Sequence, residues 1–178
     1  MLAAVAAGAA ILIGGARGGS PAGTYGQIPA WLPKPTTKVG RVVTASGAHT
    51  WLAIQGDVVR VELAAGRVRA LAVGPSVPED GQFPVPPTSP CTFTVTLSKA
   101  SGRVPLAASA FTILDERGGL HRPQVRLYGG GPLPAAVRPG TTIRLTVHDV
   151  LPTGEGRLRW APNGGRPIVS WDFDVEID

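Results

Sequence analysis

Short runs of alternating apolar and polar residues, interrupted by glycine and proline, constrain this chain more than any other feature. Residues 58–63 (VVRVEL) place three apolar side chains on one face of an extended chain and Arg60 and Glu62 on the other. Residues 92–97 (TFTVTL) repeat the pattern with threonines. Glycine and proline, which favour turns, account for 24 and 18 of the 178 residues. The pattern predicts antiparallel strands with one buried and one solvent-exposed face.

About nine or ten such strands are expected, and residues 37–178 contain no convincing helix. Six prolines between residues 74 and 90 exclude a central strand there, so we expect 74–91 to be a proline-rich surface connection. Strands separated by frequent turn signals indicate a β-sandwich or a β-barrel. The expected strands are 38–45, 50–54, 58–63, 67–73, 92–97, 111–114, 120–128, 142–148, 156–161 and 167–178.

The N-terminal residues form an uncharged run of small and aliphatic side chains at 2–15. This run is shorter than the roughly 17–25 residues that cross a bilayer as a helix, and it fits the apolar core of a signal peptide. No basic stretch precedes it, so either the start site is placed too late or the signal is a weak one. A buried soluble helix is the alternative.

Three segments are therefore expected. Residues 1–16 are predicted to be a signal peptide or membrane anchor, and 17–36 a Pro/Gly-rich extended spacer. Residues 37–178 are predicted to form the β domain. The protein is expected outside the cytoplasm, either secreted or anchored to the membrane by its N-terminal segment.

The net charge of +5 and the isoelectric point near 10.1 bring anionic partners into consideration: wall polymers, lipid headgroups or nucleic acid. The basic residues are mostly scattered, with close pairs only at Arg67/Arg69 and Arg157/Arg159. Nucleic-acid sites usually cluster charge and add aromatic platforms, so no nucleic-acid partner is expected. A solvated basic surface is the simplest interpretation. The single cysteine, Cys91, rules out an intrachain disulfide.

The C-terminal residues 171–178 alternate strictly, with an acidic residue at every second position. The preceding strand carries Arg157 and Arg159 on one face, and a hairpin would lay them against Asp172 and Asp174. Exposed pairs of this kind contribute about 0.2–1 kcal/mol each. Protection of an edge strand is a second interpretation. A calcium site is a third interpretation: outward side chains stand about 6.6 Å apart, so two of the carboxylates could meet at one ion with help from a loop, but four in a row cannot. The simpler interpretations are favoured, and no metal site is predicted.

No catalytic centre is recognisable in the sequence. His49, His121 and His148 lie in separate segments without ligand spacing, and Cys91 has no neighbouring histidine. No Gly-x-Ser-x-Gly elbow, phosphate loop, Cys-x-x-Cys or His-Glu-x-x-His is present. We predict that the protein is not an enzyme and uses no cofactor. His148 is expected to be simply exposed.

Four segments resemble the telokin-like, immunoglobulin-like domains of exported bacterial proteins, expected to be actinobacterial. They are CTFTVTL at 91–97, SAFTILDERGG at 109–119, RPGTTIRLTV at 138–147, and RLRW with SWDFDVEI at 157–177. The resemblance implies an all-β, immunoglobulin-like antiparallel β-sandwich outside the cytoplasm, with no shared catalytic residues. The chain departs from many relatives because it lacks a lipid-anchor cysteine and has a proline-rich connection.

The function that these observations favour is a non-enzymatic exported or membrane-anchored binding or accessory module, which acts on a protein or a cell-envelope component. The alternative is an extracytoplasmic carrier of a metal or small ligand, using the acidic stripe or the histidines. An enzyme with a dispersed site is a third class. The candidate binding residues are Asp172, Asp174, Glu176, Arg157, Arg159, Arg144 and His148.

Overall fold

The computed structural model describes residues 42–78 and 86–175. The predictions for 1–16 and 17–36 lie outside these residues. The described chain forms thirteen strands and one short 3-10 helix, η1 (Ala108–Ala110). The strands are β1 (Val43–Ser46), β2 (Trp51–Ile54), β3 (Val58–Leu63), β4 (Gly66–Ser76), β5 (Thr88–Gly102), β6 (Val104–Pro105), β7 (Phe111–Asp115), β8 (Leu120–His121), β9 (Gln124–Leu127), β10 (Ala136–Val137), β11 (Ile143–Pro152), β12 (Gly154–Trp160) and β13 (Val169–Val175).

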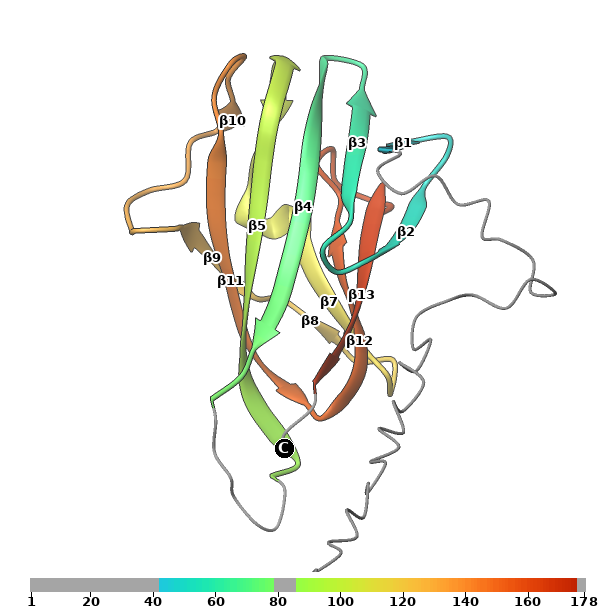
Figure 1. The fold of residues 1–178 in the computed structure, drawn as a ribbon, viewed down its shortest axis with the longest axis vertical. Coiled ribbons are helices and arrows are strands. Elements are labelled where there is room, and N and C mark those ends of the chain that lie inside the picture. Colours follow the sequence, from blue (N-terminus) through green and yellow to red (C-terminus); the bar gives the residue numbers. More distant parts are fainter. Residues whose placement is uncertain (1–41, 79–85, 176–178) are drawn as a thin grey trace, which may run out of the picture. The chain divides into compact units, whose positions relative to one another are not determined.

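Two sheets pack face to face (Figure 1). Sheet A has six strands in the order β1-β3-β4-β5-β11-β9, and sheet B has five in the order β2-β13-β12-β7-β8. Strands β6 and β10 form a separate small pair. The apolar side of each alternating strand faces the other sheet, so Phe93, Val95 and Leu97 are buried as expected. The predicted all-β sandwich is confirmed.

Aromatic side chains join the two sheets across the core. The rings of Phe93 in β5 and Phe173 in β13 meet edge to face, with centroids 4.8 Å apart. Phe111 and Trp160 stack within sheet B at 5.9 Å. Gly156 lies beside the Phe173 ring, where a Cβ atom would collide with it. A glycine in the otherwise regular strand β12 therefore makes room for a core aromatic ring.

Both sheets contain one parallel pair at an edge, while the other pairs are antiparallel. Strand β1 runs parallel to β3 and β2 runs parallel to β13. A tight turn between β1 and β2 carries the chain from one sheet to the other, and the Ser46 amide donates to the His49 carbonyl at 2.8 Å. Strand β13 therefore lies between β2 and β12. The interpretation of its acidic residues as edge protection is wrong, because β2 forms the edge.

Central strands enter the proline-rich segment from both ends, so the prediction of a surface connection over the whole of 74–91 is wrong at both ends. Strand β4 continues to Ser76, with Pro75 inside an irregular step of the ladder. Strand β5 begins at Thr88, and Pro90 lies beyond the last β5 residue that pairs with β4. Both prolines thus occupy places where a missing backbone N–H is tolerated. Residues 79–85 lie outside the described part.

The predicted strand 120–128 is two strands that belong to different sheets. Strand β8 pairs with β7 in sheet B, whereas β9 pairs with β11 in sheet A. Arg122 and Pro123 connect them, and Pro123 is buried. Since proline has no N–H to donate to a ladder, the strand breaks there and the chain crosses between sheets. The short strands β6 and β10 lie outside the expected strands.

Candidate functional site

The outward side of sheet A carries five arginines, which we call the arginine face. They project from alternate positions of β3, β4, β9 and β11, and their neighbours along each strand point into the core. Among the outward positions of these four strands in the described chain, one residue, Glu62, is acidic, and it lies opposite Arg67. The arginine face consists of Arg60, Arg67, Arg69, Arg126 and Arg144.

Two members of the arginine face oppose each other directly. Arg60 of β3 and Arg69 of β4 are cross-strand partners, and both are half-buried. In residues 42–78 and 86–175 no carboxylate lies within 4.0 Å of either guanidinium. Like charges placed directly opposite each other in a sheet are destabilising. A bound anion would relieve this repulsion.

The arginines on the other two strands of the face each contact a neighbouring side chain. The Arg144 guanidinium lies 4.1 Å from the centre of the Tyr128 ring, a cation–π contact. The Arg126 Nη2 donates to the Gln124 side-chain oxygen at 3.2 Å. Both arginines are exposed. Each therefore keeps several N–H groups for a ligand while its side chain is partly ordered.

Uncharged side chains separate the two groups of arginines. Leu71 of β4 and Thr96 of β5 lie in one cross-strand row, which continues to Arg144. Val73, Thr94 and Thr146 form the next row, which ends at Arg126. Val73 is 49% exposed. The centre of the face thus offers methyl groups and hydroxyls, with cations on either side.

His148 lies on the same outer face but is not free. Its Nδ1 and the Thr92 hydroxyl oxygen are 3.0 Å apart across β5 and β11, and the two groups share a hydrogen bond. The prediction that His148 is simply exposed is wrong, because a threonine lies directly opposite it in the ladder.

Sheet B carries the remaining candidates on the opposite outer face. The Arg157 Nε donates to Asp172 Oδ1 at 2.9 Å, as predicted for the hairpin of β12 and β13. The prediction that Arg159 pairs with Asp174 is wrong, because the register places Ser170 opposite Arg159 and Glu155 opposite Asp174.

An open groove of about 740 Å³ runs along this acidic side of sheet B. Its acidic residues come from three strands and the turn after β7, and Arg157 is its basic residue. Within the described ranges, no three histidine, cysteine or acidic side chains are placed to hold a metal ion together. Glu176 lies outside the described residues. The acidic residues that line the groove are Asp115, Glu116, Glu155, Asp172 and Asp174.

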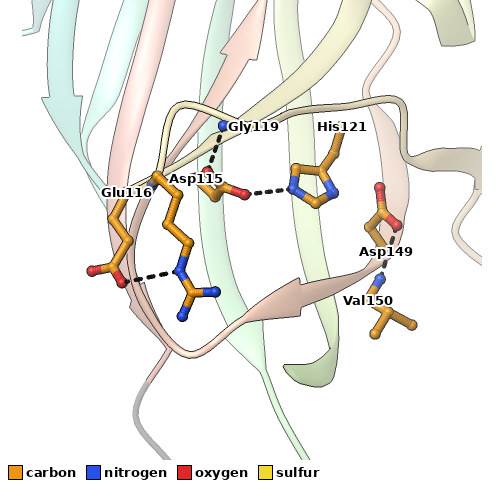
Figure 2. A network of polar contacts seen from close by, with 7 residues as sticks. Asp115, Glu116, Gly119, His121, Asp149 and Val150 are labelled. Carbon is orange, nitrogen blue, oxygen red and sulfur yellow. Dashed lines mark hydrogen bonds and ion pairs between the residues drawn. The ribbon is translucent and has the colours of Figure 1, made fainter. Parts of the chain in front are cut away.

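Asp115 organises the turn that ends β7 (Figure 2). Its carboxylate accepts hydrogen bonds from His121 Nε2 at 2.9 Å and from the amides of Gly119 at 2.6 Å and Arg117 at 3.0 Å. The hydrogen bond from His121, followed by that from Gly119, lowers the pKa of Asp115 below its ordinary value of 3.8. Figure 2 shows His121 between Asp115 and Asp149. The Asp115 carboxylate in this network therefore stabilises the turn between β7 and β8.

Replacing Asp115 with asparagine is expected to lower the urea midpoint of unfolding at neutral pH, since the amide cannot accept all three hydrogen bonds as a carboxylate does. Because the folded-state pKa is lowered, the ionised carboxylate stabilises the fold above pH 3.8, and this stabilisation is lost as the pH falls through the folded value. The difference between wild type and variant is therefore expected to shrink in acid. Urea unfolding followed by circular dichroism over this range measures it, and a constant difference would contradict the assignment.

Cys91 is a core residue and not a reactive thiol. Its side chain is fully buried, and its Sγ donates to the Ser89 carbonyl at 3.4 Å. Burial raises the pKa of this thiol to about 11. The thiol is protonated at neutral pH, so it is a poor nucleophile.

The arginine face was missed as a unit by sequence reasoning, although Arg144 was among the candidates. The signal was present: Arg60 lies on the polar side of VVRVEL, and Arg67 and Arg69 alternate in the next strand. A two-residue turn at 64–65 sets Leu63 opposite Gly66, which fixes Arg60 against Arg69.

No protein-family model and no curated protein matches the chain. The solved structure of MPT63, a secreted protein from Mycobacterium tuberculosis, is similar with a TM-score of 0.44 and 16% identity. The match covers 71% of this chain and 99% of MPT63. Structural similarity at this level does not indicate what this chain binds. Within residues 42–78 and 86–175, no helix is long and apolar enough to cross a membrane.

Proposed function

We propose that this chain is an exported, non-enzymatic binding module whose arginine face binds an anionic component of the cell envelope. The observation that carries the proposal is the opposition of Arg60 and Arg69 without a carboxylate partner in the described chain. Such an arrangement costs stability in the free protein and favours binding of an anion. The apolar run at 2–15 supports export.

The type of cation supports the same function. Fourteen of the 17 basic residues are arginines. A guanidinium is planar, stays charged at any physiological pH and donates paired hydrogen bonds to phosphate or carboxylate oxygens. Lysines would serve equally well for solubility alone. Arginines at outward positions of a sheet are suited to recognising an oxyanion.

The charge distribution orients the domain relative to an anionic surface. Cations gather on the outer face of sheet A, while the acidic groove lies on sheet B. An anionic surface therefore attracts one side of the sandwich and repels the other. The alternative of a metal or small-ligand carrier is less well supported, because the acidic residues line an open groove without converging on a point.

The full chain should co-sediment with envelopes isolated from its host, and binding should weaken as salt is added. Arg60→Gln with Arg69→Gln is expected to reduce the affinity by about tenfold or more, since each charged hydrogen bond contributes about 1.5–3 kcal/mol. The matched control is Arg159→Gln with Arg166→Gln, which removes the same charge from sheet B and the turn before β13. Both variants should unfold at the wild-type urea midpoint or above.

Equal losses in the two double variants would mean that net charge, and not the arginine face, governs binding. Undiminished binding by the Arg60 and Arg69 variant would also contradict the proposal.

A further inference from the structure

We propose that the ligand is a linear polymer with phosphate groups at intervals, which lies across the strands of sheet A and is held at two points. This rests on the proposed function. The first point is Arg60 with Arg69, and the second is Arg126 with Arg144.

The separation of the two points requires an extended ligand. The first point lies between β3 and β4, and the second between β11 and β9, with β5 in the middle of the order. Neighbouring strands are about 4.8 Å apart, so the two points are about 14 Å apart across the sheet. The register adds a further offset along the strands, because Arg144 and Arg126 lie in later rows than Arg69. One phosphate cannot contact both points.

The surface between the points selects for an uncharged carbon-rich spacer. Leu71 and Val73 lie there with the hydroxyls of Thr94, Thr96 and Thr146. A polymer whose charged groups follow one another without a neutral spacer would place unpaired anions over Leu71 and Val73, which is unfavourable. A polyol or sugar unit instead packs its carbons on these side chains and its hydroxyls on the threonines. The ligand therefore alternates charged and neutral groups.

The first point favours phosphate over carboxylate. Arg60 and Arg69 lie directly opposite each other on adjacent strands. One guanidinium donates two parallel hydrogen bonds and fills both oxygens of a planar carboxylate. A phosphodiester within a polymer has two charged oxygens, which lie out of the plane of its ester bonds, so one oxygen can face each guanidinium. Two opposed arginines are thus better matched by phosphate.

The twist of the sheet favours a flexible chain over a membrane surface. Adjacent strands are rotated by about 20–25°, so three strand spacings turn the surface by roughly 60–75°. A planar bilayer would contact one of the two points while the other turned away. A polymer that crosses the strands follows the twist and contacts both.

The test measures binding of the full chain to four probes by fluorescence anisotropy or calorimetry. They are long poly(glycerol phosphate), glycerol phosphate dimer, polygalacturonate as a carboxylate polymer, and vesicles of phosphatidylglycerol with phosphatidylcholine. Three double variants are compared: Arg60→Gln with Arg69→Gln, Arg126→Gln with Arg144→Gln, and the control Arg159→Gln with Arg166→Gln.

Long poly(glycerol phosphate) is expected to bind at least tenfold more tightly than the dimer, because two points act together. Either arginine-face double variant should abolish this advantage of length, whereas the control should retain it. Polygalacturonate and the vesicles should bind more weakly than the long phosphate polymer.

Three outcomes would overturn the inference and leave the proposed function standing, provided that envelopes still bind through Arg60 and Arg69. They are equal affinity for polygalacturonate, tighter binding of vesicles, and no advantage of length. If none of the probes binds, the inference is also overturned, and envelope sedimentation then shows whether the proposed function falls with it.

Discussion

Replacing Trp171 with alanine is expected to lower the free energy of unfolding by about 3–5 kcal/mol, a large fraction of the stability of a domain of this size. Trp171 is 1% exposed and lies in β13, between β2 and β12, where its side chain points into the core. Its removal leaves a large cavity between the sheets. Guanidinium unfolding followed by far-ultraviolet circular dichroism measures the loss.

A matched pair of conservative variants separates the hydrogen bond of Trp171 from its volume. The Trp171 Nε1 donates to the Asp57 carbonyl at 3.3 Å, whereas the Trp160 Nε1 is buried with no partner among the described residues. Trp171→Phe leaves the Asp57 carbonyl unpaired, but Trp160→Phe removes an unpaired donor. The first variant is therefore expected to lose about 1 kcal/mol more than the second. Equal losses would show that Trp171 contributes through its volume alone.

Replacing Gly102 with alanine is expected to lower the free energy of unfolding by about 3 kcal/mol or more. Gly102 ends β5 with a φ of +74°, a conformation that costs an alanine about 1–2 kcal/mol. A Cβ atom at this position would also collide with the Ala65 carbonyl oxygen. Because that oxygen belongs to the backbone of the β3–β4 turn, the ladder must shift to admit the methyl group.

Gly140 supplies the control for this variant. Its φ of +73° is nearly the same, but no atom lies within 4 Å of the place that a Cβ would occupy. Gly140→Ala is therefore expected to cost about 1–2 kcal/mol from the backbone conformation alone. Chemical denaturation of both variants isolates the collision as the difference. Losses of the same size would contradict the close approach of the two turns.

The core of the fold is predictable from the sequence because burial within a strand is a local property. The alternation in 58–63 and 92–97 marks inward and outward residues wherever each strand lies in a sheet. The same holds for β11, where Leu145 and Val147 are buried as expected. An error in the order of the strands leaves these assignments unchanged.

The assignment of strands to sheets could not be predicted in this way, because it depends on contacts between distant segments. Residues 120–128 look like one strand, yet β8 and β9 join different sheets. The parallel pairs at the sheet edges likewise depend on contacts between distant segments, since β1 pairs with β3 and β2 pairs with β13. Pro123 is a local signal of the break that the prediction overlooked.

The candidate residues divide between the two outer faces for the same reason. Arg144 and His148 lie on sheet A, whereas Asp172, Asp174, Arg157 and Arg159 lie on sheet B. Alternation shows that each of the six points outward, but the pattern along a single strand does not place two strands in one sheet. The pairing of Arg60 with Arg69 follows from the short β3–β4 hairpin. It is therefore the part of the site that could have been predicted from the sequence.

Mapping amide chemical shifts in the isotope-labelled protein during titration with an anionic polymer tests the central claim most directly. The perturbed residues are expected to lie on the outer face of sheet A, in rows that include Arg60, Arg69, Thr96 and Arg144, with sheet B unchanged. Perturbations concentrated on β7, β12 and β13, or none at a saturating polymer concentration, would contradict it.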